Sequence, residues 1–218
     1  MGINLTEYNC FELTGNSYHD IIGLTGVYGL FSLENVRNAI NAKISDAHDI
    51  IEINIVVDGI KIIRKIHLKA QYLENVLLKA KEHRGQGIGF EMLKSQIEYG
   101  RKMEFKRIEL LAWGAIDEEF NGYLTWAKYG FTMMANSSRW FRETLIPELK
   151  RIGAIYKDYS NVHELLDDIE ISGEEVWAVF GEAWYGVFLL SKKSYNTKRL
   201  QSYDYMKKVK KAFSSAIS

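Results

Sequence analysis

The chain has 218 residues, of which 47% are hydrophobic, so it can bury a sizeable core as one elaborated domain or two small ones. Lysine and arginine together number 28, as do aspartate and glutamate, and this balance gives no general reason to expect binding to nucleic acid or to an anionic membrane. The single cysteine, Cys10, excludes an intramolecular disulfide and suits a reducing compartment. The sequence has no apolar run of roughly 18 residues and no secretory signal. We therefore expect a cytoplasmic protein that does not span a membrane.

The first part of the chain is predicted to contain a helix and then a β-hairpin. The helix is expected at residues 32–43. Residues 50–57 and 60–68 are rich in β-branched and apolar side chains, and they flank Asp58-Gly59, a pair favoured in two-residue type I′ turns. Residues 72–80 continue as a third strand that leads into a run of glycines.

A helix followed by a strand, a helix and a strand is expected after the glycines. Apolar residues recur there at three- and four-residue spacing, at Ile88, Met92, Leu93 and Ile97. This spacing predicts one apolar face of a helix that ends near residues 100–103. The next predicted elements are a strand at 108–113, a short helix at 121–128 and a strand at 131–134. A hairpin followed by a strand–helix–strand crossover predicts an α+β fold, with parallel pairing near the middle of its sheet.

The rest of the chain is predicted to be mostly helical, with two blocks of opposite charge. Its elements are helices at 140–155, 162–169 and 173–180, a strand at 185–191 and a helix at 198–213. The acidic block holds Asp158, Glu164, Asp167, Asp168, Glu170, Glu174 and Glu175. The basic block holds Lys192, Lys193, Lys198, Arg199, Lys207, Lys208, Lys210 and Lys211. Either the blocks are solvated helix faces that partly complement each other, or the basic tail binds RNA or an acidic partner and the acidic block attracts a cationic substrate.

The most informative feature is the segment of residues 83–89, which places three glycines at every second position between a predicted strand and a predicted helix. Glycines permit a tight turn and a close approach to a ligand, so N–H groups can converge on an anion at the helix N-terminus. The spacing Gly85-x-Gly87-x-Gly89 differs from that of dinucleotide-binding folds, and the Gly-Lys-Ser/Thr of a P-loop is absent. A turn without a ligand is the alternative, but Arg84 beside such N–H groups favours a bound anion.

Residues 84–89, Arg-Gly-Gln-Gly-Ile-Gly, resemble the Arg/Gln-x-x-Gly-x-Gly/Ala signature of the GNAT superfamily of N-acetyltransferases, in which this loop holds the pyrophosphate of acetyl-CoA. Residues 77–80 resemble the fourth strand of that family, and residues 105–110 the entry to its fifth. Residues 126–131 resemble its later helix-to-strand junction, which ends in Gly-Phe. The resemblance covers roughly residues 50–134.

This resemblance implies a GNAT-like central mixed sheet flanked by helices. A single acetyltransferase domain would span residues 1–218, with its core at about 50–134 and 184–191. Residues 135–183 would then be a helical insertion before the last strand, and residues 195–213 a basic C-terminal helix.

By the same resemblance, acetyl-CoA would lie along the cofactor strand and the loop that follows it. The pantetheine arm would pair with backbone groups of Leu78, Lys79 and Ala80, and an N–H near Ala80 would stabilise the oxyanion. The pyrophosphate would be held by Arg84, Gly85, Gln86, Gly87, Ile88 and Gly89. Asn121, at the start of a later helix, is a candidate to bind the arm or its thioester side. No metal site is expected, because five histidines and one cysteine without H-x-x-x-H spacing offer none.

Acetyl transfer to an amine needs a base for the amine and an acid for the leaving thiolate. Glu74 is the candidate base because relatives often place a glutamate near this point, although it could be a solvent-facing edge residue. His67 and His83 are further groups that can titrate near neutral pH. Many relatives use a tyrosine four residues before the Gly-Phe pair as the acid, but Trp126 stands there. Tyr123, about one turn earlier, is the candidate acid unless it and Trp126 only pack the helix onto the sheet.

The sequence therefore predicts an N-acetyltransferase that moves an acetyl group from acetyl-CoA to a primary amine by direct transfer in a ternary complex. We expect a monomer or a homodimer. The acceptor amine stays open, because the segments expected to build its pocket lie outside the resemblance. The alternatives are a non-catalytic acyl-CoA-binding or protein-interaction module on the same fold, and an RNA-directed role through the basic C-terminal helix.

Overall fold

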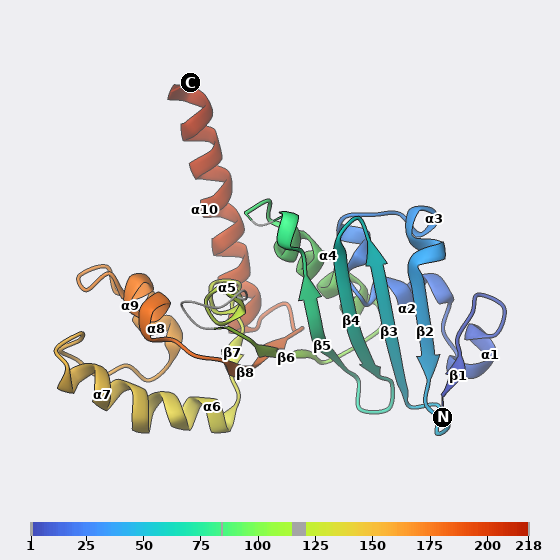
Figure 1. Cartoon of the computed structure of the whole chain (residues 1–218), viewed down its shortest axis with the longest axis horizontal. Helices are drawn as coiled ribbons and strands as arrows, with labels where there is room; N and C mark the ends of the chain where they lie inside the picture. Colours follow the sequence, from blue (N-terminus) through green and yellow to red (C-terminus); the bar gives the residue numbers. More distant parts are fainter. Residues whose placement is uncertain (1, 84, 115–120, 218) are drawn as a thin grey trace. The chain divides into compact units, whose positions relative to one another are not determined.

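The computed structural model describes residues 2–83, 85–114 and 121–217, and it combines strands with helices as the α+β prediction requires (Figure 1). The chain divides into two compact units, Met1–Glu109 and Leu110–Ser218, which are called unit 1 and unit 2 below.

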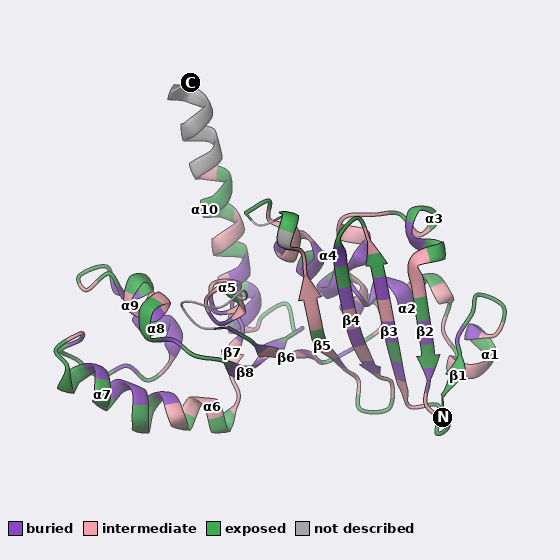
Figure 2. Ribbon diagram, viewed as in Figure 1, coloured by how far each residue is buried: buried purple, intermediate pink, exposed green. Residues whose placement is uncertain are grey.

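Unit 1 is built on an antiparallel sheet. Its strands are adjacent in chain order: β1 (Ile3–Asn4), β2 (Ile40–Ile44), β3 (Ile50–Val57), β4 (Ile60–His67) and β5 (Tyr72–Lys79). Buried side chains alternate with more exposed ones along β3 and β4, so one face of the sheet is covered (Figure 2). The buried side chains of these two strands include Ile51, Ile53, Ile55, Ile60, Ile62 and Ile66.

The turn between β3 and β4 has the expected type I′ geometry. Asp58 has a φ of 47° and Gly59 a φ of 73°, so both central residues lie in the left-handed region. The three strands predicted from residue 50 onward are confirmed to within one residue at each end.

One long helix and several short helical segments accompany this sheet. They are α1 (Cys10–Thr14), α2 (Tyr18–Gly23), η1 (Val27–Gly29), α3 (Leu33–Val36), η2 (Arg37–Ala39), η3 (Lys81–His83) and α4 (Ile88–Lys102). The helix predicted after the glycines is confirmed as α4. Its buried face includes Phe90, Leu93 and Ile97, in agreement with the apolar spacing of the sequence.

The helix predicted at residues 32–43 is wrong in its second half. Only α3 and the short η2 are helical, and β2 begins at Ile40 and pairs with β3. Ala42 and Ile44 are buried on alternate positions of β2. The burial gained through strand pairing outweighs the local helix propensity of this segment.

Two glycines allow η1 and the residue before it to pack directly on α4. A Cβ added to Gly26 would lie 2.3 Å from the carbonyl oxygen of Met92, and one added to Gly29 would lie 2.4 Å from that of Glu91. Any other side chain would push these segments apart. The N-terminal segment is thereby held against the first half of the helix that follows the glycine loop.

A buried pair of amide side chains joins β5, α4 and the N-terminal segment. Nδ2 of Asn75 donates to Oε1 of Gln96 at 3.0 Å, and Nε2 of Gln96 donates to Oδ1 of Asn75 at 2.8 Å. The same Nε2 donates to the carbonyl oxygen of Leu24 at 2.9 Å. Asn75 is 7% exposed and Gln96 only 1%, so these bonds form away from water. They fix the position of α4 along β5.

Unit 2 is mostly helical. Its elements are α5 (Gly122–Lys128), β7 (Thr132–Met133), α6 (Ala135–Trp140), the π-helical η4 (Phe141–Leu145), α7 (Ile146–Arg151), α8 (Val162–Leu166), α9 (Gly173–Phe180), β8 (Trp184–Leu189) and α10 (Tyr195–Ile217). The strands β7 and β8 pair antiparallel. One further strand, β6 (Arg107–Ala112), contains the division between the units.

The predicted elements of this half are confirmed, with shifts at their ends. The helix expected at 140–155 is the largest change, because the helical residues run from 135 to 151 through the π-helical η4. Pro147, in the first turn of α7, has no N–H to donate to the carbonyl four residues earlier. This missing bond accounts for the wider π turn before it.

The core of unit 2 is organised around the backbone of Tyr123. Its carbonyl oxygen accepts hydrogen bonds from the indole N–H of Trp177 at 3.2 Å and from that of Trp184 at 2.9 Å. Both indoles are almost fully buried, as is Phe141, whose ring contacts Trp177 edge-on. Helix α5 is thereby tied to α9 and β8.

We predict that breaking the amide pair destabilises unit 1 in a non-additive way. Gln96→Leu leaves the amide of Asn75 buried without its partner, and this should lower the free energy of unfolding by about 1–3 kcal/mol. Asn75→Leu should have a similar effect. The double variant should lose less than the sum of the two, because neither side-chain amide is then left without its partner. Urea unfolding followed by circular dichroism measures the three values, and strictly additive losses would contradict the pairing.

Candidate functional site

The glycine loop joins the end of β5 to the start of α4. Gly85 has a φ of 77° and Gly87 a φ of 80°, so both use the left-handed region that glycine occupies without strain. Gly87 is the N-cap of the 15-residue α4. A Cβ added to Gly85 would meet no atom within 4 Å, so open space lies beside this backbone. Arg84 lies outside the described residues.

This geometry suits an anion. The first N–H groups of a helix have no intrahelical acceptor, and a glycine N-cap has no side chain to accept from them. These N–H groups and the helix dipole together favour negative charge at the start of α4. Gln86, Ile88 and Gly89 complete the loop and the first turn of the helix.

His83 connects the glycine loop to the β3–β4 hairpin. Its Nε2 lies 3.0 Å from the carbonyl oxygen of Asp58, and its Nδ1 lies 3.3 Å from Oε1 of Gln86. The hydrogen bond to the Asp58 carbonyl, with a smaller effect from Gln86, raises the pKa of His83. The imidazole therefore positions the loop against the turn of the hairpin.

A β-bulge interrupts β5 just before the residues expected to bind the pantetheine arm. Ile63 pairs with Leu77, but the next residue, Arg64, pairs with Asn75, so Val76 is the extra residue on β5. Leu78 and Lys79 resume the pairing with β4 after the bulge. The carbonyl of Ala80, which follows the strand, accepts the backbone N–H of His83 at 3.1 Å and begins the turn.

Arg64 holds the bulge in place from the buried face of the sheet. Its Nη1 donates to the carbonyl oxygens of Ile63 at 3.0 Å and Leu77 at 2.6 Å. The residue is only 2% exposed, and burial lowers the pKa of its guanidinium to about 9. Within the part of the chain that the structure describes, no carboxylate pairs with it, and its Nε has no hydrogen-bond partner.

Sequence reasoning missed Arg64 and the amide pair of Asn75 and Gln96. A signal for Arg64 was present, since it takes an alternate position among Ile60, Ile62 and Ile66, all of which are buried. A charged residue on the apolar face of a strand is unusual enough to indicate a buried polar role.

Glu74 lies on β5 two residues before the bulge. Leu73 and Asn75 on either side of it are buried, so its side chain is on the opposite face of the strand. Its Oε2 lies 3.2 Å from Nε2 of His67, whose ring stacks on Tyr72 with a centroid distance of 4.0 Å. The side chain of Glu74 is 36% exposed. Glu74 and His67 thus form a solvent-accessible acid–base pair near the start of the strand.

The remaining predicted site residues belong to unit 2. Asn121 is the exposed N-cap of α5, and its side chain forms no capping bond. The hydroxyl of Tyr123 donates to the carbonyl oxygen of Ala178 at 2.6 Å, and burial raises the pKa of this tyrosine. Trp126 packs edge-on against the rings of Tyr129 and Phe131. Tyr123 and Trp126 therefore both contribute to the packing of α5.

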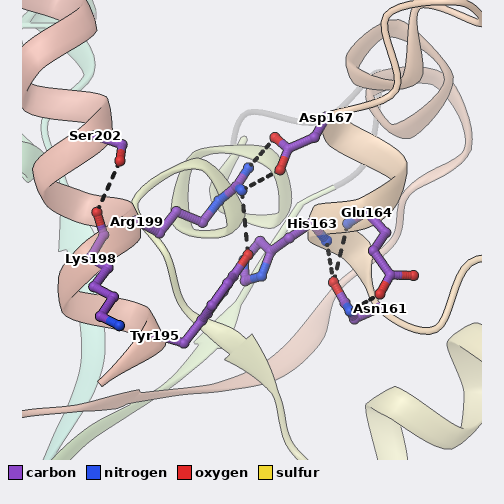
Figure 3. A network of polar contacts seen from close by, with 8 residues as sticks. All are labelled: Asn161, His163, Glu164, Asp167, Tyr195, Lys198, Arg199 and Ser202. Carbon is purple, nitrogen blue, oxygen red and sulfur yellow. Dashed lines mark hydrogen bonds and ion pairs between the residues drawn. The ribbon is translucent and has the colours of Figure 1, made fainter. Parts of the chain in front are cut away.

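A second polar cluster in unit 2 connects α8 with α10 (Figure 3). Arg199 binds both carboxylate oxygens of Asp167, at 2.7 and 2.9 Å. His163 is 2% exposed, and its ring lies 5.2 Å from that of Tyr195. Nε2 of His163 is buried and makes no hydrogen bond to any described residue. Burial, with the nearby charge of Arg199, lowers the pKa of His163 to about 4.

This cluster also shows how the charged side chains of the acidic and basic blocks are paired. The Arg199–Asp167 pair joins the basic block to the acidic block. Other acidic side chains pair instead with lysines that lie outside the basic block, as in Lys150–Asp158, Lys157–Asp168 and Lys128–Glu174. The blocks complement each other at this pair, and three further side chains of the acidic block are neutralised locally.

The described residues hold neither a cluster of metal ligands nor a helix suited to cross a membrane. They contain no group of three or more histidine, cysteine, aspartate or glutamate side chains that could hold a metal ion. None of their helices combines the length and the apolar composition that crossing a bilayer requires.

No family model matches the chain, and no curated protein matches it in sequence. Among solved structures, it is similar to the crystal structure of nourseothricin acetyltransferase, with a TM-score of 0.36 and 13% identity over 69% of this chain and 71% of that chain.

We predict that His163 makes unit 2 less stable as the pH falls from about 6.5 toward 4. In this window the histidine takes up a proton in the unfolded state but not in the folded state. Each pH unit therefore lowers the free energy of unfolding by up to about 1.4 kcal/mol. Tryptophan fluorescence reports on unit 2, since all five tryptophans follow residue 110. As the pH is lowered, the urea midpoint of the wild type should decrease more steeply than that of His163→Leu. Parallel pH profiles would contradict the assignment.

Proposed function

We propose that the chain is an N-acetyltransferase that binds acetyl-CoA at the glycine loop and transfers its acetyl group directly to an amine. The observation that carries the proposal is the pair of left-handed glycines, Gly85 and Gly87, at the N-terminus of α4 with open space beside Gly85. Helix N–H groups and the helix dipole favour phosphate oxygens at such a place. The resemblance of residues 84–89 to the GNAT signature names the pyrophosphate of acetyl-CoA as the group bound.

In this proposal β5 is the strand along which the pantetheine arm lies. Backbone groups of Leu78, Lys79 and Ala80 begin two residues after the bulge, and the arm would pair with them as an added strand. Arg64 acts as a positioning residue, because its two hydrogen bonds hold the bulge that sets the direction of this segment. Asn121 would bind the arm or its thioester side.

Transfer requires one proton to leave the amine and one to reach the sulfur. The amine nitrogen attacks the thioester carbonyl, the C–S bond breaks, and the products are an amide and the thiol of CoA. We assign the base to Glu74, whose carboxylate is solvent-accessible and is held by His67. Tyr123 is the candidate acid, and to protonate the thiolate its hydroxyl would first have to leave the carbonyl of Ala178.

One observation favours a second candidate function, a non-catalytic acyl-CoA-binding module. The hydroxyl of Tyr123 is engaged in the core of unit 2, and Trp126 occupies the position where many GNAT enzymes have their acid. The two functions differ in one measurement. Binding of acetyl-CoA without thiol release on a panel of free lysine, spermidine and a lysine-containing peptide would favour the module.

We predict that a negative charge at Gly85 abolishes tight binding of acetyl-CoA. Gly85→Glu should weaken binding by at least about tenfold, because a carboxylate would repel the phosphates. Gly15→Glu is the matched control: Gly15 is also left-handed, at 71°, and also has no atom within 4 Å of an added Cβ. Both variants carry the same backbone strain and charge. Calorimetry that shows equal affinities for the two variants would refute the proposed site.

We predict that Glu74→Gln lowers turnover at least about a hundredfold but leaves the dissociation constant of acetyl-CoA unchanged, because only proton abstraction is lost. Release of free CoA, followed with a thiol-reactive chromophore, measures turnover. Glu52→Gln on β3 is the control and should retain activity. Unchanged turnover in Glu74→Gln would assign the base elsewhere.

A further inference from the structure

Unit 1 contains a pocket at the end of the sheet opposite to the glycine loop. Its volume is about 350 Å³, and it is lined by Thr14, Asn16, His48, Leu68, Lys69, Gln71, Met103 and Phe105. Gln71 directly precedes β5 and Met103 directly follows α4, whereas the glycine loop lies between the other ends of these two elements. The 15 residues of α4 span about 22 Å. The pocket and the glycine loop are therefore separated by about the length of α4.

The walls of this pocket are four connecting segments, three of which hold a residue in an unfavourable backbone conformation. His48, Gln71 and Glu104 have φ values of 53°, 52° and 59°. The first two line the pocket, and Glu104 lies between two lining residues. The carbonyl of Gln71 accepts the backbone N–H of Lys106 at 2.8 Å, which ties two of the segments together. Left-handed residues are typical of tight turns and helix ends, so these three residues mark the sharp turns that form the walls of the pocket.

The lining combines an apolar surface with unengaged polar side chains. Leu68, Met103 and Phe105 provide the apolar part. Within the described part of the chain, the side chains of His48, Lys69 and Gln71 form no hydrogen bond or ion pair. No carboxylate is among the lining residues. The pocket therefore offers donors and positive charge next to an apolar surface.

The end of α4 does not cancel this positive charge. Carbonyl groups at a helix C-terminus favour cations, but here Tyr99, Gly100 and Arg101 have their carbonyls bonded to the N–H groups of the following turn. Asp49, whose charge is close enough to interact with Lys69, accepts the hydroxyl of Ser45 at 2.7 Å and is not a lining residue.

We propose that this pocket binds a small organic anion, with its charged group at Lys69 and His48 and its apolar body on Phe105, Met103 and Leu68. Gln71 supplies an additional amide donor. The site is separate from the glycine loop and does not depend on the proposed acetyl transfer. Because the lining includes Lys69 and no carboxylate, it disfavours a cationic amine, and a ligand here is an effector or a structural ligand of unit 1.

Three planar molecules of nearly equal shape test this assignment on the full chain. Benzoate is negative, benzamide neutral and benzamidine positive, so their affinities separate the effect of charge from that of shape. Saturation-transfer NMR and calorimetry should detect benzoate binding that is at least tenfold tighter than that of benzamidine. Benzoate should still bind when the protein is saturated with acetyl-CoA. Equal affinities, no benzoate binding, or displacement of benzoate by acetyl-CoA would overturn the proposal.

Two pairs of variants locate the binding. Lys69→Glu should weaken benzoate binding at least tenfold, whereas Lys61→Glu, which lies on β4 and outside the pocket, should not. Gln71→Gly and Glu104→Gly both relieve a left-handed φ and should fold at least as well as the wild type. Only Gln71→Gly removes a lining side chain, so only it should weaken benzoate binding, by about threefold to tenfold. If the two variants of either pair changed the affinity for benzoate equally, benzoate would bind outside this pocket and the proposal would be wrong.

Discussion

The reciprocal amide bond between Asn75 and Gln96 is the contact on which the arrangement of unit 1 depends. Apolar packing alone would let α4 slide along the sheet, because dispersion contacts have little directionality. Two hydrogen bonds away from water allow one register only, since any shift leaves buried amides without partners. The glycine loop between β5 and α4 therefore has both of its ends fixed.

A second constraint acts on β5 itself. Arg64 carries a buried guanidinium that no described carboxylate neutralises, and this arrangement is costly in free energy. Its hydrogen bonds to Ile63 and Leu77 recover part of that cost and at the same time hold the bulge at Val76. The bulge matters for the proposed donor site because it sets where Leu78 to Ala80 lie. The side chain of Arg64 thus affects both the stability of unit 1 and the position of the β5 backbone.

In unit 2, the role that the sequence predicts for Tyr123 differs from the role that the structure shows. The position of Tyr123 before the Gly-Phe pair predicts an acid, yet its carbonyl and hydroxyl oxygens organise the aromatic core. Its partners, Trp177, Trp184 and Ala178, lie more than 50 residues away in the chain. Spacing within one helix carries no information about such distant partners, so the packing role could be seen only in the structure.

The sequence by itself determined the elements whose signals are local. The Asp58-Gly59 turn, the third strand and the apolar face of α4 follow from residues that are neighbours in the chain. Tertiary structure decided what depends on partners far along the chain: the pairing of β2 with β3 in place of a helix, the bulge beside Arg64, and the pocket assembled from four separate connections. The physical reason is that strand pairing, burial and the closing of a polar network are properties of contacts, and contacts between distant residues leave no periodic pattern in the sequence.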